Sequence, residues 1–201
     1  MISNKVLALT GSCVTALAVS ALIRENHKFN LGEDVLCGTL AGGVIIGASA
    51  GLITNPAAAL AIGCIGGAVC TICYAKLKSK VSEKFSLHDT CGVNNLHGIP
   101  GFLGGILSAI VVASYQSQPM DENIRKYLSF YEGNDGAKSL AEQAGIQVAG
   151  TFISLGIAVV AGLISGFFMR MTVSLNNEEL FEDSIYFTGF NDEDDKLNDT
   201  L

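Results

Sequence analysis

Residues 35–75 read VLCGTLAGGVIIGASAGLITNPAAALAIGCIGGAVCTICYA, a run of forty-one residues without Asp, Glu, Lys or Arg. A helix needs about 20 apolar residues to cross the hydrocarbon core of a bilayer, so this run is too long for one span. Asn55-Pro56 divides it near its middle, because proline disfavours helix in the preceding residue and suits the first turn of a new helix. The run therefore predicts two membrane spans, 35–54 and 56–75, joined by a tight turn.

Three more apolar windows flank this pair, at about 6–23, 91–114 and 143–169. Hydrophobic residues make up 49 % of the chain and charged residues only 15 %, and the mean hydropathy of +0.43 argues against a soluble domain. The first window also resembles a secretory signal peptide with a small-residue cleavage site at 18–21, but it is long for one and four spans follow. We predict an all-α, polytopic membrane protein with five transmembrane helices in a membrane domain over residues 1–175.

The charges cluster at the C-terminus and in the short loops. The segment 176–201 carries nine acidic residues and one lysine, so the formal charge of −7 belongs to this tail and the body is nearly neutral. Loops on the cytoplasmic side of a membrane carry an excess of Lys and Arg. Eight basic residues fall on the side of the tail and four on the other, which predicts an outside N-terminus and a cytoplasmic acidic tail. No basic face suited to nucleic acid is found.

Glycines at four-residue spacing recur across four of the spans, and small residues at that spacing let membrane helices approach closely. We expect helix packing at five of them: Gly42, Gly43, Gly98, Gly101 and Gly105. The six cysteines lie in or beside apolar runs, and Cys70 and Cys73 have no second pair at zinc-site spacing. They are predicted to pack rather than to bind metal or react, and no cofactor is implied.

His97 is the main candidate for a functional residue. It lies in an uncharged run from Thr90 to Met120 and follows Asp89 by eight residues, about 12 Å along a helix. A histidine carried into a bilayer is costly and suggests a function. A hydrogen bond to a neighbouring helix is the structural alternative. We expect Asp89 to bond free N–H groups at the helix mouth, His88 to be interfacial and His27 to be solvated.

The residues around His97 closely resemble a known signature. Asp89-Thr90-Cys91-Gly92-Val93-Asn94-Asn95-Leu96-His97-Gly98-Ile99-Pro100-Gly101 is similar to the motif of Rh glycoproteins, the Rh branch of the ammonium transporter (Amt/Mep/Rh) family. Residues 39–44 and 181–186 resemble other family motifs. The resemblance implies an eleven- or twelve-helix inverted repeat with a hydrophobic pore in each subunit of a trimer. Two pore histidines handle ammonium or ammonia, with carbon dioxide as an alternative solute. His97 matches the second-half histidine and Asp89 the acidic residue before it.

The chain departs from the family in extent. Its five predicted spans correspond to the last five helices, and the first-half histidine, its acidic partner and the gating phenylalanines have no counterpart. In an inverted repeat the site forms between the halves. We therefore interpret the chain as a C-terminal fragment, multi-pass in the plasma membrane, that transports ammonium or ammonia only with an N-terminal half. The alternative is a non-transporting assembly subunit of Rh-type oligomers. A membrane enzyme would have only His97 and Asp89 to use, and we predict no catalysis.

Overall fold

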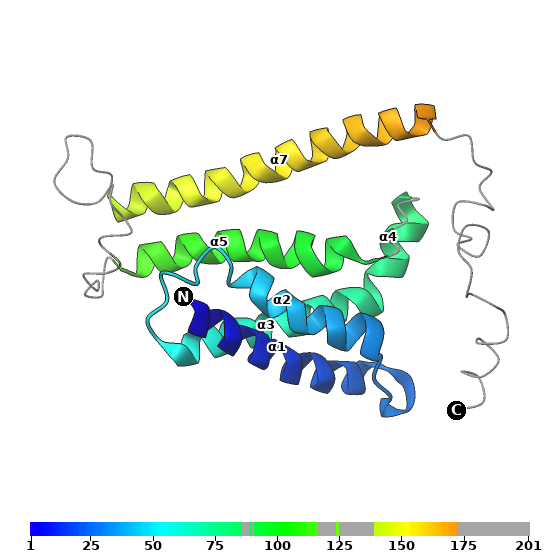
Figure 1. The fold of residues 1–201 in the computed structure, drawn as a ribbon, viewed down its shortest axis with the longest axis horizontal. Coiled ribbons are helices and arrows are strands. Elements are labelled where there is room, and N and C mark those ends of the chain that lie inside the picture. Colours follow the sequence, from blue (N-terminus) through cyan, green and yellow to red (C-terminus); the bar gives the residue numbers. More distant parts are fainter. Residues whose placement is uncertain (86–88, 90, 116–123, 125–138, 173–201) are drawn as a thin grey trace. The chain divides into compact units, whose positions relative to one another are not determined.

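The regular secondary structure of the described residues is entirely helical. The computed structural model describes residues 1–85, 89, 91–115, 124 and 139–172. This confirms the predicted all-α class. In chain order the elements in Figure 1 are α1 (Ile2–Ile23), η1 (Glu25–His27), η2 (Leu31–Leu36), α2 (Cys37–Ile45), α3 (Pro56–Lys76), α4 (Lys78–Phe85), η3 (Asn94–Gly98), α5 (Ile99–Ser114) and α7 (Leu140–Thr172).

Four helical segments of the described residues are long and apolar enough to cross a membrane. They are Ile2–Ile23, Pro56–Lys76, Asn94–Ser114 and Leu140–Met171. The chain is accordingly an integral, multi-pass membrane protein. His88, the basic residues of the loop before α7 (Arg125, Lys126 and Lys138), the acidic tail 176–201 and the motif at 181–186 lie outside the described residues.

The predicted boundary at Asn55-Pro56 is confirmed. Asn55 is the N-cap of α3, and its side-chain oxygen accepts a hydrogen bond of 2.9 Å from the N–H of Ala57. Pro56 occupies the first helical position, where a missing N–H costs nothing because that N–H has no partner inside a helix. Two local signals, a capping side chain and a proline, thus start α3 where the sequence predicted.

The segment 35–54 differs from the single span that we predicted. Its helix begins earlier, in η2, and ends at Ile45, after which the backbone continues in turns to Leu52. Glycine weakens a helix, and Gly47 and Gly51 both lie in the turns. The carbonyls freed there find donors elsewhere: the Asn4 side chain donates to the carbonyls of Ala50 (3.0 Å) and Ile53 (2.6 Å). Tyr115 donates to the carbonyl of Leu52. Such partners are required because backbone at membrane depth cannot rely on water.

Helices α1, α2 and α3 pack against one another through small side chains. The buried face of α1 carries small or short polar residues at about four-residue spacing: Asn4, Ala8, Gly11, Ser12, Ala16 and Ser20. The hydroxyl of Ser12 donates to the carbonyl of Gly38 on α2. On α3, a Cβ added to Gly63 would lie 2.5 Å from the Cα of Ala8, so only glycine permits this approach. Close backbone packing of this kind is how membrane helices associate without a hydrophobic driving force.

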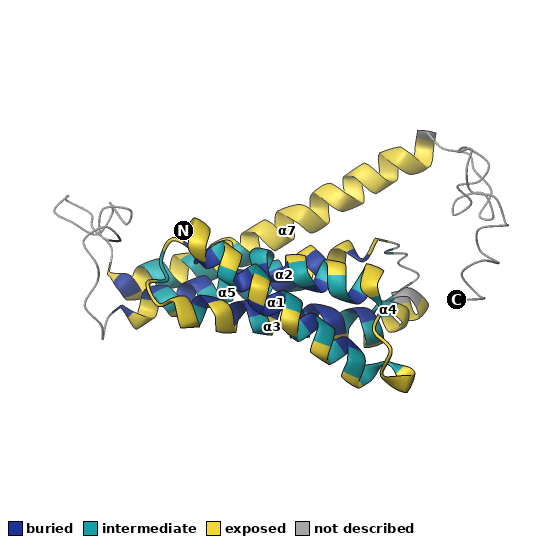
Figure 2. Cartoon of the chain, turned by 60° about the horizontal axis from the view of Figure 1, so that its bottom comes forward, coloured by how far each residue is buried: buried dark blue, intermediate teal, exposed yellow. Residues whose placement is uncertain are grey.

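Residues Met1–Leu155 form one compact unit, and Gly156–Leu201 form a second. Two contacts within the first unit join α5 to the start of α7. The hydroxyl of Ser108 donates to the side-chain oxygen Oε1 of Gln147 at 3.3 Å, and the rings of Phe102 and Phe152 meet edge to face with their centroids 5.5 Å apart. From Phe152 to Met171 every residue of α7 is exposed, as Figure 2 shows by its uniform colour. Because this helix is also strongly apolar, its surface suits lipid or another apolar partner rather than water.

Candidate functional site

His97 lies on a π-helical turn at the start of a membrane span. The turn, η3, covers Asn94–Gly98, and its cap N–H at Ile99 bonds the carbonyl of Asn94 five residues back. Pro100 has no N–H to offer the carbonyl of Leu96, so a regular α-helical ladder cannot continue through this point. The imidazole of His97 is exposed, while the neighbouring Asn95 and Leu96 are buried. Isolated π turns of this kind are frequent at functional sites.

The start of this turn has all of its first N–H groups satisfied. Both oxygens of the Asp89 carboxylate accept backbone hydrogen bonds of 2.8 Å, one from Val93 and one from Asn94. The carbonyl of Gly92 accepts the next two N–H groups, those of Asn95 and Leu96, each at 3.0 Å. The prediction that Asp89 bonds free N–H groups at the helix mouth is confirmed. A negative charge is also favoured there by the helix dipole.

A tyrosine that the sequence analysis did not single out holds the other side of this turn. The hydroxyl of Tyr74, on α3, donates to the carbonyls of Cys91 (2.8 Å) and Gly92 (3.0 Å). Gly92 has a φ of +66°, and a Cβ there would overlap the phenol ring of Tyr74. The glycine at position 92 was visible in the motif, but nothing in the sequence pairs it with a tyrosine eighteen residues earlier.

The five glycines predicted to mediate packing have different neighbours. Gly42 faces the backbone of α1 at Ala8, Gly43 faces Leu9, and Gly105 faces the Thr151 side chain of α7. An added Cβ at Gly98 would lie 2.8 Å from the Asn94 side chain of its own turn rather than near another helix. At Gly101 the nearest atom, on Val44, would be 3.8 Å away, which is an ordinary contact with room for a methyl group.

A buried charge network closes the same end of the bundle. Asp34 is fully buried, and its carboxylate accepts hydrogen bonds from Ser20 (2.7 Å) and from Nε (2.9 Å) and Nη2 (2.8 Å) of Arg24. These bonds raise the pKa of the Arg24 guanidinium, against an opposing effect of burial. Glu33 pairs with Lys78 at 2.5 Å, which ties η2 to the start of α4. The sequence showed these residues only as the charged ends of apolar windows.

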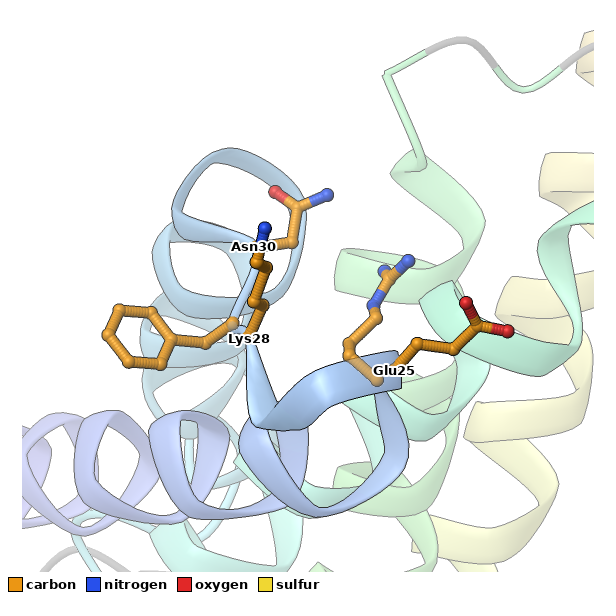
Figure 3. Close-up of a pocket in the computed structure, with 5 residues that line it drawn as sticks. Glu25, Lys28 and Asn30 are labelled. Carbon is orange, nitrogen blue, oxygen red and sulfur yellow. The ribbon is translucent and has the colours of Figure 1, made fainter. Parts of the chain in front are cut away.

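Two cavities are lined by described residues of the helices and of the turn between α1 and η2. An open pocket of about 370 Å³ lies at the turn between α1 and η2 and is lined by Arg24, Glu25, Lys28, Phe29 and Asn30. In Figure 3, Glu25 points away from Lys28 and Asn30. An apolar groove of about 210 Å³ is lined by side chains of α2, α3 and α5, namely Ile45, Ile62, Ile65, Leu103, Ile106, Leu107 and Ile110. Neither cavity is lined by His97.

The cysteines and His27 lie elsewhere in the described part of the chain. The six cysteines are all free, and no group of three or more His, Cys, Asp or Glu residues among the described residues is placed to hold a metal ion. His27 is exposed in a short turn, with Nδ1 3.2 Å from the carbonyl oxygen of Ala21. His97, by contrast, is exposed on a π-helical turn at the start of a span, a placement that suggests function.

Comparison with known proteins identifies relatives over nearly the whole chain. The model of the Ammonium Transporter Family matches residues 1–191. Ammonium transporter Rh type C of Xenopus tropicalis is 30 % identical over 186 residues, and Rh type B of Mus musculus is 33 % identical over 186 residues. Each alignment covers 92 % of this chain and 40 % of the relative. The structure of Nitrosomonas europaea Rh50, described as a channel of the Rhesus family, matches with a TM-score of 0.70 at 31 % identity, over 100 % of this chain and 44 % of that one. This chain thus spans about two-fifths of the length of the relatives it matches.

Proposed function

This chain belongs to the ammonium transporter family, in its Rh branch, and we propose that it forms one wall of a hydrophobic path for ammonia or ammonium lined by His97. The observation that carries the proposal is the placement of His97. Its imidazole is exposed on a π-helical turn at the start of an apolar span, and this imidazole makes no hydrogen bond within the described residues. A histidine with only a structural role in a membrane bundle would face a partner inside the bundle.

Physical chemistry indicates what such a histidine does. A charged solute is costly in a low-dielectric path, so ammonia passes more readily than ammonium. A neutral imidazole offers one N–H donor and one acceptor nitrogen, and it matches a small solute that both donates and accepts. His97 replaces part of the hydration shell that the solute loses on entering. It can also take the proton that ammonium releases.

We further propose that the path closes only when another protein segment supplies the opposite wall. The chain covers 40 % of its Rh relatives. A histidine on one wall of a path stays exposed until the opposite wall is present, and the imidazole of His97 is exposed in this structure. The assembled transporter is proposed to be a trimer in the plasma membrane, with the N-terminus outside and the acidic tail cytoplasmic. The eight-to-four distribution of basic residues supports that orientation.

The test is methylammonium uptake by cells that lack their own ammonium transporters. The chain is co-expressed with a segment equivalent to the first three-fifths of an Rh transporter. We expect uptake from the pair and from neither part alone. His97→Ala in the pair should change uptake about tenfold, the effect of losing one hydrogen bond to the solute. His27→Ala, in an exposed turn, is the matched control and should leave uptake unchanged. An unchanged rate with His97→Ala would refute the pore role, and trimer assembly without uptake would instead favour a structural subunit.

A further inference from the structure

We propose that Tyr74 is a positioning residue for His97, acting through the backbone of residues 91–96. Its relevance to transport rests on the proposed function, but the positioning itself does not. The side chain of Tyr74 is 5 % exposed near the C-terminal end of α3 and reaches across to the segment that precedes η3. It touches no part of the imidazole in any described contact, so its influence passes through the main chain.

The first link is the pair of carbonyls that accept from Tyr74. The phenol O–H lies 2.8 Å from the carbonyl oxygen of Cys91 and 3.0 Å from that of Gly92. The carbonyl of Gly92 also accepts the N–H groups of Asn95 and Leu96. One backbone oxygen therefore joins α3 to the first turn of the span that carries His97.

The second link is the conformation of Gly92. Its φ of +66° lies in the left-handed region, where a side chain is strained, and an added Cβ would overlap the phenol of Tyr74. The absence of a side chain lets the backbone close onto the tyrosine hydroxyl. The contact is thus built from both sides, by a buried donor on α3 and by a glycine that turns its carbonyl toward that donor.

The consequence for His97 follows from its exposure. Since no described side chain holds the imidazole, its place is set by the backbone of η3. Asp89 fixes two N–H groups of this turn, but Asp89 is itself in the loop and is not anchored to another span by any described hydrogen bond. Tyr74 supplies the connection to a neighbouring helix. A displacement of about 1 Å of a reacting group is enough to change rates roughly a hundredfold.

The experiment measures the imidazole directly, without transport. The full chain is prepared in detergent micelles with ¹³C,¹⁵N-histidine, and the His97 signals are assigned from His97→Gln. Tyr74→Phe removes the hydroxyl and keeps the ring. We expect it to shift or broaden the His97 signals and to raise amide exchange at Val93–Leu96 about tenfold. Tyr115→Phe is the matched control. Tyr115 follows the far end of α5, and its hydroxyl likewise donates to a backbone carbonyl, that of Leu52.

Unchanged His97 signals in Tyr74→Phe, or an equal response to Tyr115→Phe, would overturn the inference. If Tyr74→Phe does not fold, amide hydrogen exchange in the unsubstituted chain tests whether the contact of Tyr74 with this turn exists. Amides 93–96 should then be as protected as the middle of α5, and exchange at the rate of an open loop would refute the contact. If the His97 signals respond while His97→Ala leaves uptake unchanged, the proposed function fails and the positioning role stands.

Discussion

The close approach of α1 and α3 at Gly63 allows a prediction with a magnitude. A Cβ added there would lie 2.5 Å from the Cα and 2.6 Å from the carbonyl carbon of Ala8, whereas ordinary contact begins at 3.4 Å. The carbonyl oxygen of Ala8 would lie closer still, so Gly63→Ala forces the two helices apart by at least about 0.9 Å, or displaces the α1 backbone by as much. Inserting one methyl group into a well-packed core costs about 1–3 kcal/mol.

The same substitution has an opposing effect. Replacing glycine by alanine in a helix removes conformational freedom from the unfolded chain, and this stabilises the helix by about 0.5–1 kcal/mol. Gly150→Ala isolates that contribution, because no atom among the described residues lies within 4 Å of a Cβ at position 150. The free energies of unfolding of the two variants should differ by about 1–3 kcal/mol, with Gly63→Ala the less stable.

The measurement is unfolding of the detergent-solubilised chain with increasing sodium dodecyl sulfate, followed by far-UV circular dichroism. Tryptophan fluorescence cannot serve, because the sequence contains no Trp. Equal stabilities for the two variants, or a Gly63→Ala variant more stable than Gly150→Ala, would show that α1 and α3 do not meet at these residues. The packing described for these helices would then be wrong.

Two further substitutions test the end of the bundle near His97. Arg24→Met should lower the free energy of unfolding by about 3 kcal/mol, because it leaves the fully buried Asp34 without its cation, and adding Asp34→Asn should restore most of the loss. Equal unfolding midpoints for Arg24→Met and the parent chain in the same titration would contradict this. Gly92→Ala should lower the midpoint of thermal unfolding by imposing about 1–3 kcal/mol of backbone strain and displacing Tyr74. A midpoint equal to that of the parent would mean that residue 92 does not hold a positive φ.

The sequence predicted the features that local signals control. Windows free of charge locate helices because a bilayer admits only apolar spans of limited length. Asn55 and Pro56 locate the start of α3 because a cap and a proline act on the residues beside them. The same reasoning did not predict the turns that follow Ile45, since a charge-free window cannot distinguish a helix from turns. The turns there are satisfied by Asn4 and Tyr115, which are distant in the sequence.

The candidate site divides in the same way. His97 and Asp89 could be singled out because an uncharged run makes a polar side chain conspicuous, and the role of Asp89 as a cap depends on neighbours four and five residues away. Tyr74 could not be found, because its contact with Gly92 exists only once α3 and the start of the next span are side by side. Arg24 and Asp34 resembled ordinary loop charges until the fold buried one against the other.

The ion pair between Arg24 and Asp34 also bears on how the chain enters a membrane. An isolated charge costs about 2.5–3.5 kcal/mol at the centre of a span on insertion scales. Arg24 and Asp34 lie at span ends, where the cost is smaller and pairing lowers it further. Arg24 follows α1 directly, and Asp34 lies ten residues later in η2, so the ribosome delivers the cation before the anion that it neutralises. We expect α1 and α2 to leave the translocon together as a hairpin with its charges already matched. A contact that stabilises the folded bundle would in this way also cause two of its helices to be released into lipid together.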